Sequence, residues 1–257
     1  MKLTDNRIAF IYLAVLVSLT YGPVVFGPHT LANTTTTDLG IALYYEGRTV
    51  YEYATIDAGA HSWVIYPLEK LAIRMMASGE APLWDPYTAC GKPFSSDPVV
   101  GTYSITSLFY FFGPYAEDVR FILRLLIAAV GMFLFLREHE IRWSGAMAGS
   151  VVFSLSGPFT LLLQHNSTES TMLTPLILLG IERLLRARLM RRTKTSTGIL
   201  IVGVALAISL LGAHLETLIL QYSFAGLYIG LRLLQVKGDL WSKIANGSFE
   251  TGRDWVD

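Results

Sequence analysis

Acidic and imidazole side chains are concentrated in the segments that separate long apolar stretches of this chain. They are Asp57, Asp85, Asp97, His165, Glu169, His214 and Glu216. A carboxylate in such a group could take a proton from an acceptor hydroxyl, or several of them could hold a divalent cation. If the apolar stretches place these segments on one side of a membrane, the residues could form one site.

The three aspartates also have structural interpretations. Asp85 and Asp97 each precede a proline, which is a common turn signature that needs no chemistry. Asp57 lies in a Gly/Ala-rich turn before a segment with helical periodicity, so it could be the N-terminal cap of that helix. Trp84, beside Asp85, could stack on a sugar or anchor the chain at a membrane interface.

The two His/Glu pairs allow structural interpretations as well. Asn166 and Glu169 have the spacing of a capping box, in which the two side chains bind free backbone amides at a helix start. His214 and Glu216 could be solvated residues at the end of a helix. The pattern leaves the functional and structural interpretations open.

Composition places the chain among membrane proteins. Hydrophobic residues make up 52% of the sequence and charged residues only 16%, with a mean hydropathy of +0.45. The net charge of zero gives no basic excess that would indicate nucleic-acid binding. Cys90 is the only cysteine, which excludes an intramolecular disulfide.

Six hydrophobic segments could cross a bilayer. The first, Ile8–Gly27, follows a short start with Lys2 and Arg7, and a cleaved signal peptide is the competing interpretation. The later segments are Val119–Leu136, Gly145–Leu163, Thr171–Leu185, Gly198–Leu211 and Thr217–Leu234. The sequence therefore predicts an all-α polytopic membrane protein whose transmembrane domain covers residues 1–257.

Connecting charges predict the orientation. With a cytoplasmic N-terminus, the inner connections carry Arg137, Arg142, the basic run 186–194, Lys237 and Lys243. The outer connections, 165–170 and 213–216, contain no lysine or arginine, in agreement with the positive-inside rule. This orientation puts all the acidic and imidazole candidates on the extracytoplasmic side.

Residues 28–118 form a large first extracytoplasmic loop in this topology. Leu39–Tyr53 could form short strands or an interfacial helix, whereas His61–Ser78 has the periodicity of an amphipathic helix on the membrane surface. Gly79 is expected to end that helix. Thr102–Phe112 is apolar but too short to span, so we expect an interfacial or re-entrant helix.

Arg120 and Arg124 lie one helical turn apart at the outer end of the second span. They could extend toward the interface or bind an anionic group. The sequence has no Walker loop, GxGxxG, GxSxG or CxxC motif, which argues against an ATP-driven pump.

Several motifs occur in a consistent order along residues 1–235. The most specific one is Gly79–Pro86, GEAPLWDP, which is preceded by Asp57 with Tyr66-Pro67 and followed by GKP at 91–93 and SDP at 96–98. Further elements are Leu136-Arg137, FSLSG at 153–157, His165, ERLL at 182–185 and GAH at 212–214. This order resembles the YfhO-like bacterial membrane proteins, within the GT-C-type glycosyltransferases.

The resemblance implies a GT-C-like helix bundle that transfers a sugar from a polyprenyl-phosphate donor to a cell-envelope acceptor on the outer side. Asp57 matches the family's acidic residue and would be the catalytic base. Arg120 or Arg124 could hold the donor phosphate, while a divalent cation remains open. Family members are usually longer, so the chain resembles their N-terminal portion.

A non-enzymatic function is the alternative. A polytopic transporter or assembly factor for an envelope polymer could use the same outer acidic residues to bind a cation or a partner. A transporter is expected to carry polar or charged residues at mid-span. Apart from Ser, Thr and Gln221, the predicted spans are apolar there, which favours the transferase.

Overall fold

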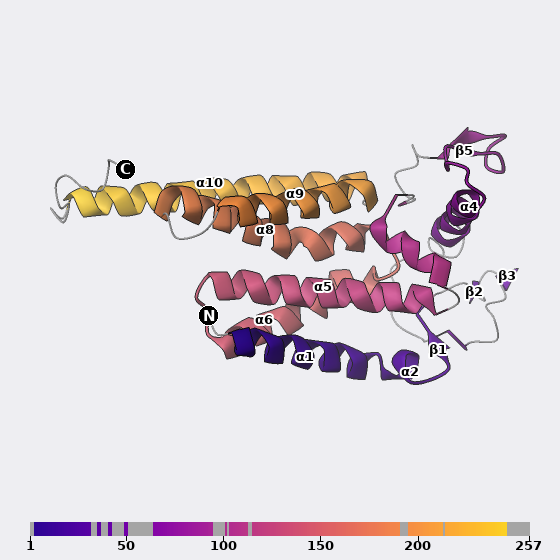
Figure 1. Ribbon diagram of the computed structural model, residues 1–257, viewed down its shortest axis with the longest axis horizontal. Helices are drawn as coiled ribbons and strands as arrows, with labels where there is room; N and C mark the ends of the chain where they lie inside the picture. Colours follow the sequence, from indigo (N-terminus) through magenta and orange to yellow (C-terminus); the bar gives the residue numbers. More distant parts are fainter. Residues whose placement is uncertain are drawn as a thin grey trace.

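The computed structural model describes residues 3–31, 35–36, 41–42, 49–50, 64–94, 101, 103–112, 115–190, 195–212 and 214–245. Within them the chain is mainly helical, and its long helices lie lengthwise in an elongated bundle (Figure 1). The long helices are α1 Leu3–Thr20, α5 Ala116–Glu138, α6 Trp143–Ser154, α8 Ser167–Met190, α9 Thr195–Gly212 and α10 Leu215–Ala245. Successive members of this set run in opposite directions along the bundle.

Three of these helices are long and apolar enough to cross a membrane. They are α5, α9 and the Leu215–Gln235 part of α10, and a shorter apolar helix covers Asn6–Thr20. The prediction of an all-α membrane protein agrees with this finding. The prediction of a bundle with six uninterrupted spans is wrong for the described residues.

Breaks in the helices explain part of the difference. The first predicted span ends at Thr20, and a four-residue helix, α2 Gly22–Val25, follows with Pro23 in its first turn. The third predicted span is divided into α6 and the short α7, Gly157–Leu161. Pro158 lies in the first turn of α7, where proline fits because that amide has no helical partner.

Charge explains why α8 is not a uniform apolar span. The helix has 24 residues, which is long enough to cross, but both ends carry ionisable side chains. Glu169 lies in its first turn, and Glu182 lies near its other end. Both carboxylates are fully buried in the bundle and bind arginines, so α8 is suited to a protein environment rather than to lipid.

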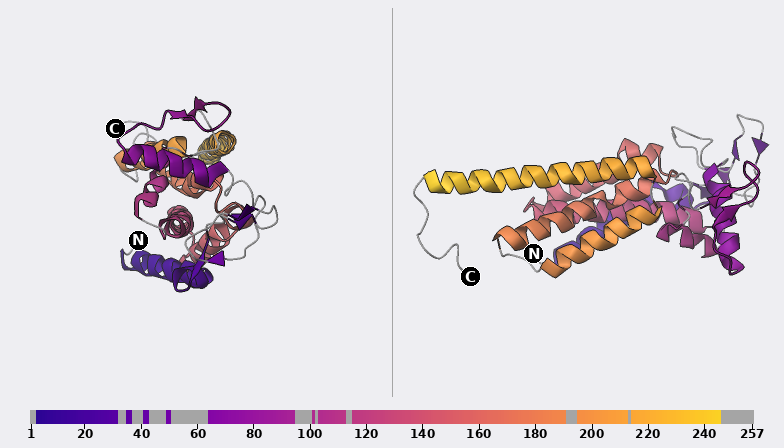
Figure 2. Two further views of the ribbon diagram at one scale, coloured as in Figure 1. Left: turned by 90° about the vertical axis from the view of Figure 1, so that its right-hand side faces the viewer. Right: turned by 90° about the horizontal axis from the view of Figure 1, so that it is seen from above.

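The predicted amphipathic helix is confirmed as α4, Tyr66–Ala77, which lies crosswise at one end of the bundle (Figure 2). Pro67 occupies its first turn, and Gly79 ends it with a positive φ of 82°. The Glu80 amide donates to the Met75 carbonyl and the Gly79 amide donates to the Met76 carbonyl, as in a Schellman motif.

Short strands and one 3-10 helix complete the same end of the molecule. The helix η4, Ile105–Phe112, is too short to span, as predicted. Strands β1 His29–Thr30 and β4 Thr49–Val50 are parallel, and β2 Thr35–Thr36 pairs antiparallel with β3 Ile41–Ala42. Of the two alternatives for Leu39–Tyr53, short strands or an interfacial helix, the described residues show short strands, Ile41–Ala42 and Thr49–Val50. Strands β5 Trp84–Asp85 and β6 Lys92–Pro93 form an antiparallel hairpin.

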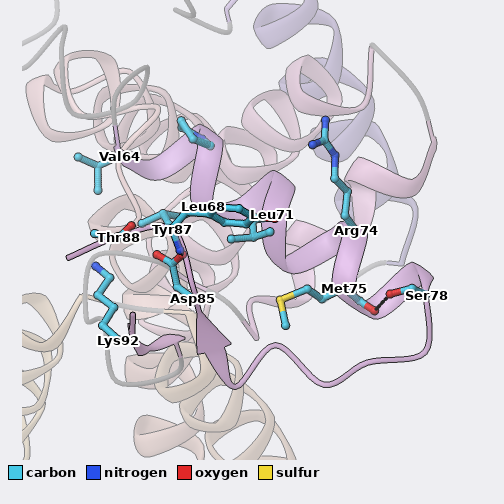
Figure 3. A pocket seen from close by; sticks show the side chains of 11 residues that line it. Val64, Leu68, Leu71, Arg74, Met75, Ser78, Asp85, Tyr87, Thr88 and Lys92 are labelled. Carbon is cyan, nitrogen blue, oxygen red and sulfur yellow. Dashed lines mark hydrogen bonds between the residues drawn. The ribbon is translucent and has the colours of Figure 1, made fainter. Parts of the chain in front are cut away.

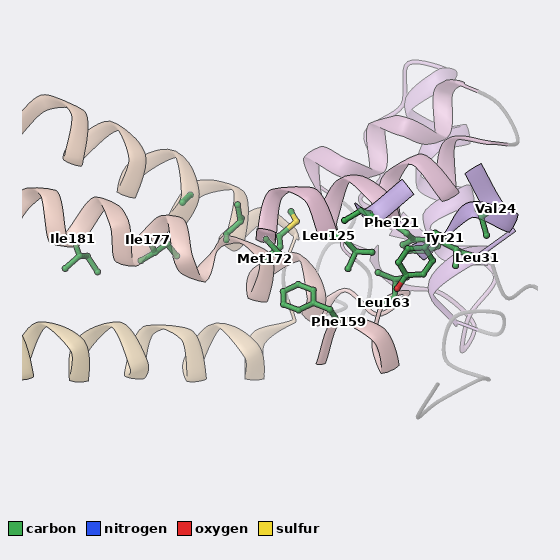
Figure 4. Packing of buried hydrophobic residues seen from close by; sticks show 14 residues of the cluster. Tyr21, Val24, Leu31, Phe121, Leu125, Phe159, Leu163, Met172, Ile177 and Ile181 are labelled. Atoms are coloured by element: carbon green, nitrogen blue, oxygen red, sulfur yellow. The ribbon is translucent and has the colours of Figure 1, made fainter. Parts of the chain in front are cut away.

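The main hydrophobic core lies along α5, where α1, α7, α8 and α9 meet it (Figure 4). Phe121 and Leu125 of α5 are fully buried and belong to one cluster with Phe159 of α7 and Met172 of α8. Close packing of α8 on α9 depends on Gly180, where a Cβ would lie 2.5 Å from the Val202 side chain. Small residues at such crossings let helices approach closely.

Candidate functional site

A pocket of about 690 Å³ lies between α4 and the β5–β6 hairpin. The apolar part of its wall comes from α4 and the residues just before it, and the polar part comes mainly from the hairpin (Figure 3). The lining residues that matter for its chemistry are Leu68, Leu71, Asp85, Thr88 and Lys92. The described lining residues all fall between Val64 and Lys92, so none of them belongs to α5, α8, α9 or α10.

Asp85 supplies the pocket's carboxylate. Its side chain is fully buried, and its Oδ1 accepts a hydrogen bond of 2.9 Å from the Tyr87 amide. Its Oδ2 has no hydrogen-bond partner among the described residues. Burial alone would raise the pKa of this carboxyl, but hydrogen bonds from Thr88 and Tyr87 and the nearby Lys92 ammonium lower it below its ordinary value. The group is therefore a carboxylate with one unused acceptor.

The hairpin register places Lys92 beside Asp85. The two residues are directly paired across β5 and β6, and opposite charges in such cross-strand positions attract. The connection between the strands, residues 86–91, contains three consecutive residues with positive φ, Ala89, Cys90 and Gly91. A Cβ on Gly91 would lie 2.7 Å from the Trp84 ring, so glycine is required where the ring packs on the backbone.

A second cluster of ionisable groups lies between α4, η4, α5 and α8. Arg120 of α5 binds both carboxylate oxygens of Glu69 on α4, at 2.6 and 2.8 Å. It also donates to Thr106 Oγ1 at 3.1 Å and to Asn166 Oδ1 at 3.2 Å. The Arg120 guanidinium is 1% exposed, so this is a buried, fork-like ion pair.

One helical turn further along α5, Arg124 forms a second buried pair. Its Nη2 lies 3.0 Å from Glu169 Oε2, and both side chains are fully buried. Ser104 Oγ lies 2.5 Å from both Glu169 oxygens, and Thr106 donates to Oε2 at 3.0 Å. Because Thr106 also accepts from Arg120, its hydroxyl joins the two ion pairs into one network.

These contacts correct one expectation about the arginines. Arg120 and Arg124 do not extend toward the interface, because each is buried and paired with a carboxylate. Glu169 likewise has a role beyond a capping box, since it accepts hydrogen bonds from the Arg124, Ser104 and Thr106 side chains.

The predicted imidazoles lie close together at this end of the bundle. The ring centroids of His165 and His214 are 5.6 Å apart. The Ser167 amide donates to His165 Nδ1 at 3.2 Å, which leaves Nε2 to carry the proton in the neutral ring. Glu216 is exposed, as expected of a solvated residue at a helix start.

The predicted residues thus fall into separate places. Trp84 and Asp85 belong to the hairpin beside the pocket, while Arg120, Arg124 and Glu169 form the buried network. Asp57 and Asp97 lie outside the described residues. Within the described part of the chain, no group of three or more His, Cys, Asp or Glu residues is placed to hold a metal ion.

Sequence reasoning missed several members of both clusters. Lys92 was not a candidate, and neither were Glu69, Ser104 and Thr106 of the buried network. Glu69 had a usable signal, because it is a charged residue in an otherwise apolar part of an amphipathic helix. The serine and threonine had none, since such residues are common in short loops.

No protein-family model, curated protein or solved structure matches the chain.

Proposed function

We propose that this protein is a membrane glycosyltransferase of the GT-C type. It would transfer a sugar from a polyprenyl-phosphate-linked donor in the bilayer to a cell-envelope acceptor on the extracytoplasmic side. The proposal places the chain in the cell membrane with its N-terminus in the cytoplasm and the α4 end of the bundle outside. Its basis is the ordered set of motifs in the sequence, of which GEAPLWDP is the most specific.

The observation that best supports a ligand-binding role is the pocket beside Asp85. The PLWDP part of the motif supplies strand β5, so the most specific motif contributes a buried carboxylate with an unused oxygen to this pocket. The hydrogen bond from the Tyr87 amide to Asp85 Oδ1 is an Asx turn and agrees with the turn interpretation of the Asp-Pro pair, whereas Oδ2 is not used by that turn. A concave site with an apolar wall and a few polar groups is typical of small-molecule binding.

The remaining proposed roles concern Asp57 and the two arginines of α5. Asp57 is proposed as the base that deprotonates the acceptor hydroxyl, on the strength of the family resemblance. Arg120 and Arg124 are not proposed to bind the donor phosphate, because their guanidinium groups already bind Glu69 and Glu169. We propose for them a positioning role at the outer end of α5.

The test is incorporation of labelled sugar from polyprenyl-phosphate donors into membranes that contain the protein. Wild type should transfer label, and Asp57→Asn should reduce transfer by at least about a hundredfold, as expected for loss of a general base. Glu216→Gln is the matched control, because Glu216 is exposed on the same side. Equal transfer by wild type and Asp57→Asn, or none by either, would overturn the proposal.

One observation favours the alternative of a transporter or assembly factor. The helix divided into α6 and α7 is interrupted at Leu155 and Ser156, between the ends of the bundle. Discontinuous helices are the elements from which many transporters build substrate sites. Uptake or export of a labelled envelope precursor by reconstituted vesicles, with no sugar transfer, would establish this alternative.

A further inference from the structure

The pocket between α4 and the β5–β6 hairpin has features that restrict its ligand. Its polar side contains Asp85 Oδ2, which has no donor among the described residues, and the ammonium group of Lys92. Its opposite side contains the aliphatic side chains of Leu68 and Leu71 (Figure 3). A buried acceptor that lacks a donor costs free energy, so a ligand that supplies one is stabilised.

Charge argues for a neutral ligand at the hairpin. Asp85 and Lys92 are paired across the two strands, so the charges that the hairpin contributes to the pocket balance, while Arg74 lines the pocket from α4. An ammonium ligand would be attracted by Asp85 but repelled by Lys92. A phosphate ligand would be attracted by Lys92 but repelled by Asp85. A pair of neighbouring hydroxyls satisfies both groups, because one can donate to the carboxylate while the other accepts from the ammonium.

Shape argues for a ring rather than a chain. The volume of about 690 Å³ is within the range of about 300–1,000 Å³ typical of ligand sites. A sugar ring has hydroxyls at its edge and apolar C–H groups on its faces, which match the polar and aliphatic sides of this pocket. The exposed Tyr87 at the rim adds an aromatic surface of the kind on which such faces pack.

We propose that this pocket binds a carbohydrate ring of the acceptor, with ring hydroxyls on Asp85 and Lys92 and a C–H face on Leu68 and Leu71. The inference rests on the proposed function, because it names the acceptor class of that reaction. The acceptor is favoured over the lipid-linked donor because none of the described lining residues comes from the long helices α5, α8, α9 and α10. A polyprenyl chain in the bilayer would lie along those helices.

The test is calorimetric binding to the full chain in phosphatidylcholine nanodiscs. The probes are the methyl glycosides of glucose, galactose, mannose and N-acetylglucosamine, with sorbitol, ethanolamine and inorganic phosphate as comparators. At least one glycoside should bind saturably, and none of the comparators should. Nanodiscs that also contain a monoglycosyl diacylglycerol form a second arm, and binding only there would identify a glycolipid headgroup as the source of the ring.

Asp85→Asn is the informative variant. Its amide oxygen can still accept the Tyr87 amide hydrogen bond that Oδ1 accepts now, so the turn is retained while the negative charge is lost. Glycoside affinity should fall by at least about tenfold, because a hydrogen bond to a charged acceptor is lost. Leu68→Trp should abolish binding by filling the pocket. Glu80→Gln, an exposed change that does not line the pocket, should bind as wild type does.

Three outcomes would overturn the inference. They are no glycoside binding in either arm, glycoside binding that Asp85→Asn leaves unchanged, and Asp85-dependent binding of ethanolamine or phosphate instead of the glycosides. Any of these with sugar transfer intact would remove the acceptor assignment and leave the proposed function standing. Glycoside binding without any sugar transfer would remove the proposed function and leave the carbohydrate-binding pocket standing.

Discussion

At the scale of single residues, the first half of α5 carries two buried ion pairs. Arg120 and Arg124 are buried with Glu69 and Glu169, and the Thr106 hydroxyl connects the two pairs. An isolated buried charge is very costly, whereas a paired and hydrogen-bonded one is tolerated. The network is therefore sensitive to small displacements of any member.

Gly212 allows a direct test of that sensitivity. A Cβ at this position would lie 2.7 Å from the Glu169 carboxyl group and 3.0 Å from Ser104 Cβ. Gly212→Ala should therefore displace Glu169 and lower the free energy of unfolding by about 1–3 kcal/mol. The measurement is thermal unfolding in detergent.

Gly203 in the same helix is the matched control. Nothing lies within 4 Å of a Cβ built there, so Gly203→Ala should keep or raise stability, by up to about 1 kcal/mol, through better helix propensity. Equal shifts in melting temperature for the two alanine variants would show that the crowding at Glu169 has no energetic consequence.

At the scale of elements, the helix α4 contacts the bundle through the Glu69–Arg120 pair and also lies against η4. On its hairpin side, Ala72 packs with Phe94, the residue after β6. Because α4 is also one wall of the pocket, the Glu69–Arg120 pair sets where that wall lies. The pair thus links the buried network to the candidate binding site.

Breaking this pair should release α4. Glu69→Ala leaves the Arg120 guanidinium buried without its carboxylate, which costs about 3–5 kcal/mol. We expect faster amide hydrogen exchange in residues 66–77, measured by mass spectrometry, while α9 exchanges as before.

Two further variants make that result interpretable. Glu80→Ala removes an exposed carboxylate close to the end of α4 and should exchange as wild type does. Glu69→Leu combined with Arg120→Met removes both charges and should restore most of the protection. Unchanged exchange in Glu69→Ala would mean that apolar packing alone holds α4.

At the scale of the whole molecule, the two ends of the bundle differ in their chemistry. The pocket, the buried network and the histidine pair lie at one end. At the other end, Glu182 binds Arg186 and Arg232 at 2.8 and 2.6 Å, close to where the basic connections begin. If α5 crosses the membrane, these two ends face opposite compartments.

The single natural cysteine can test that orientation. Cys90 is exposed in the hairpin turn, before α5, so an impermeant maleimide should label it in intact cells. The 23 residues of α5 give a length of about 34 Å, enough to cross a core of about 30 Å. Labelling is read by mass shift on a gel.

Glu140, just after α5, provides the opposite control because its side chain is 76% exposed. In the variant Cys90→Ser with Glu140→Cys, labelling should require permeabilised cells. Labelling of both positions from outside would contradict the crossing by α5, and labelling of Cys90 only after permeabilisation would invert the orientation.

The sequence by itself determined the features that depend on local pattern. Hydropathy located α5, α9 and α10, because about twenty apolar residues in a row are sufficient to identify a span. Helical periodicity and Gly79 located α4 and its end, and residues 61–63 of the predicted segment lie outside the described residues. The same reasoning overestimated the number of spans, because hydropathy averages over a break such as Leu155 and Ser156.

Only the tertiary structure decided which side chains meet. Glu69 and Arg120 are 51 residues apart, and Ser104 and Glu169 are 65 apart, so no local period connects them. Likewise, Asp85 lies opposite Lys92 only because the connection that includes residues 89–91 brings the two strands together in this register. Long-range pairing depends on how helices and loops pack. A buried charged side chain can pair with another one only where packing has placed both side chains in the same part of the interior.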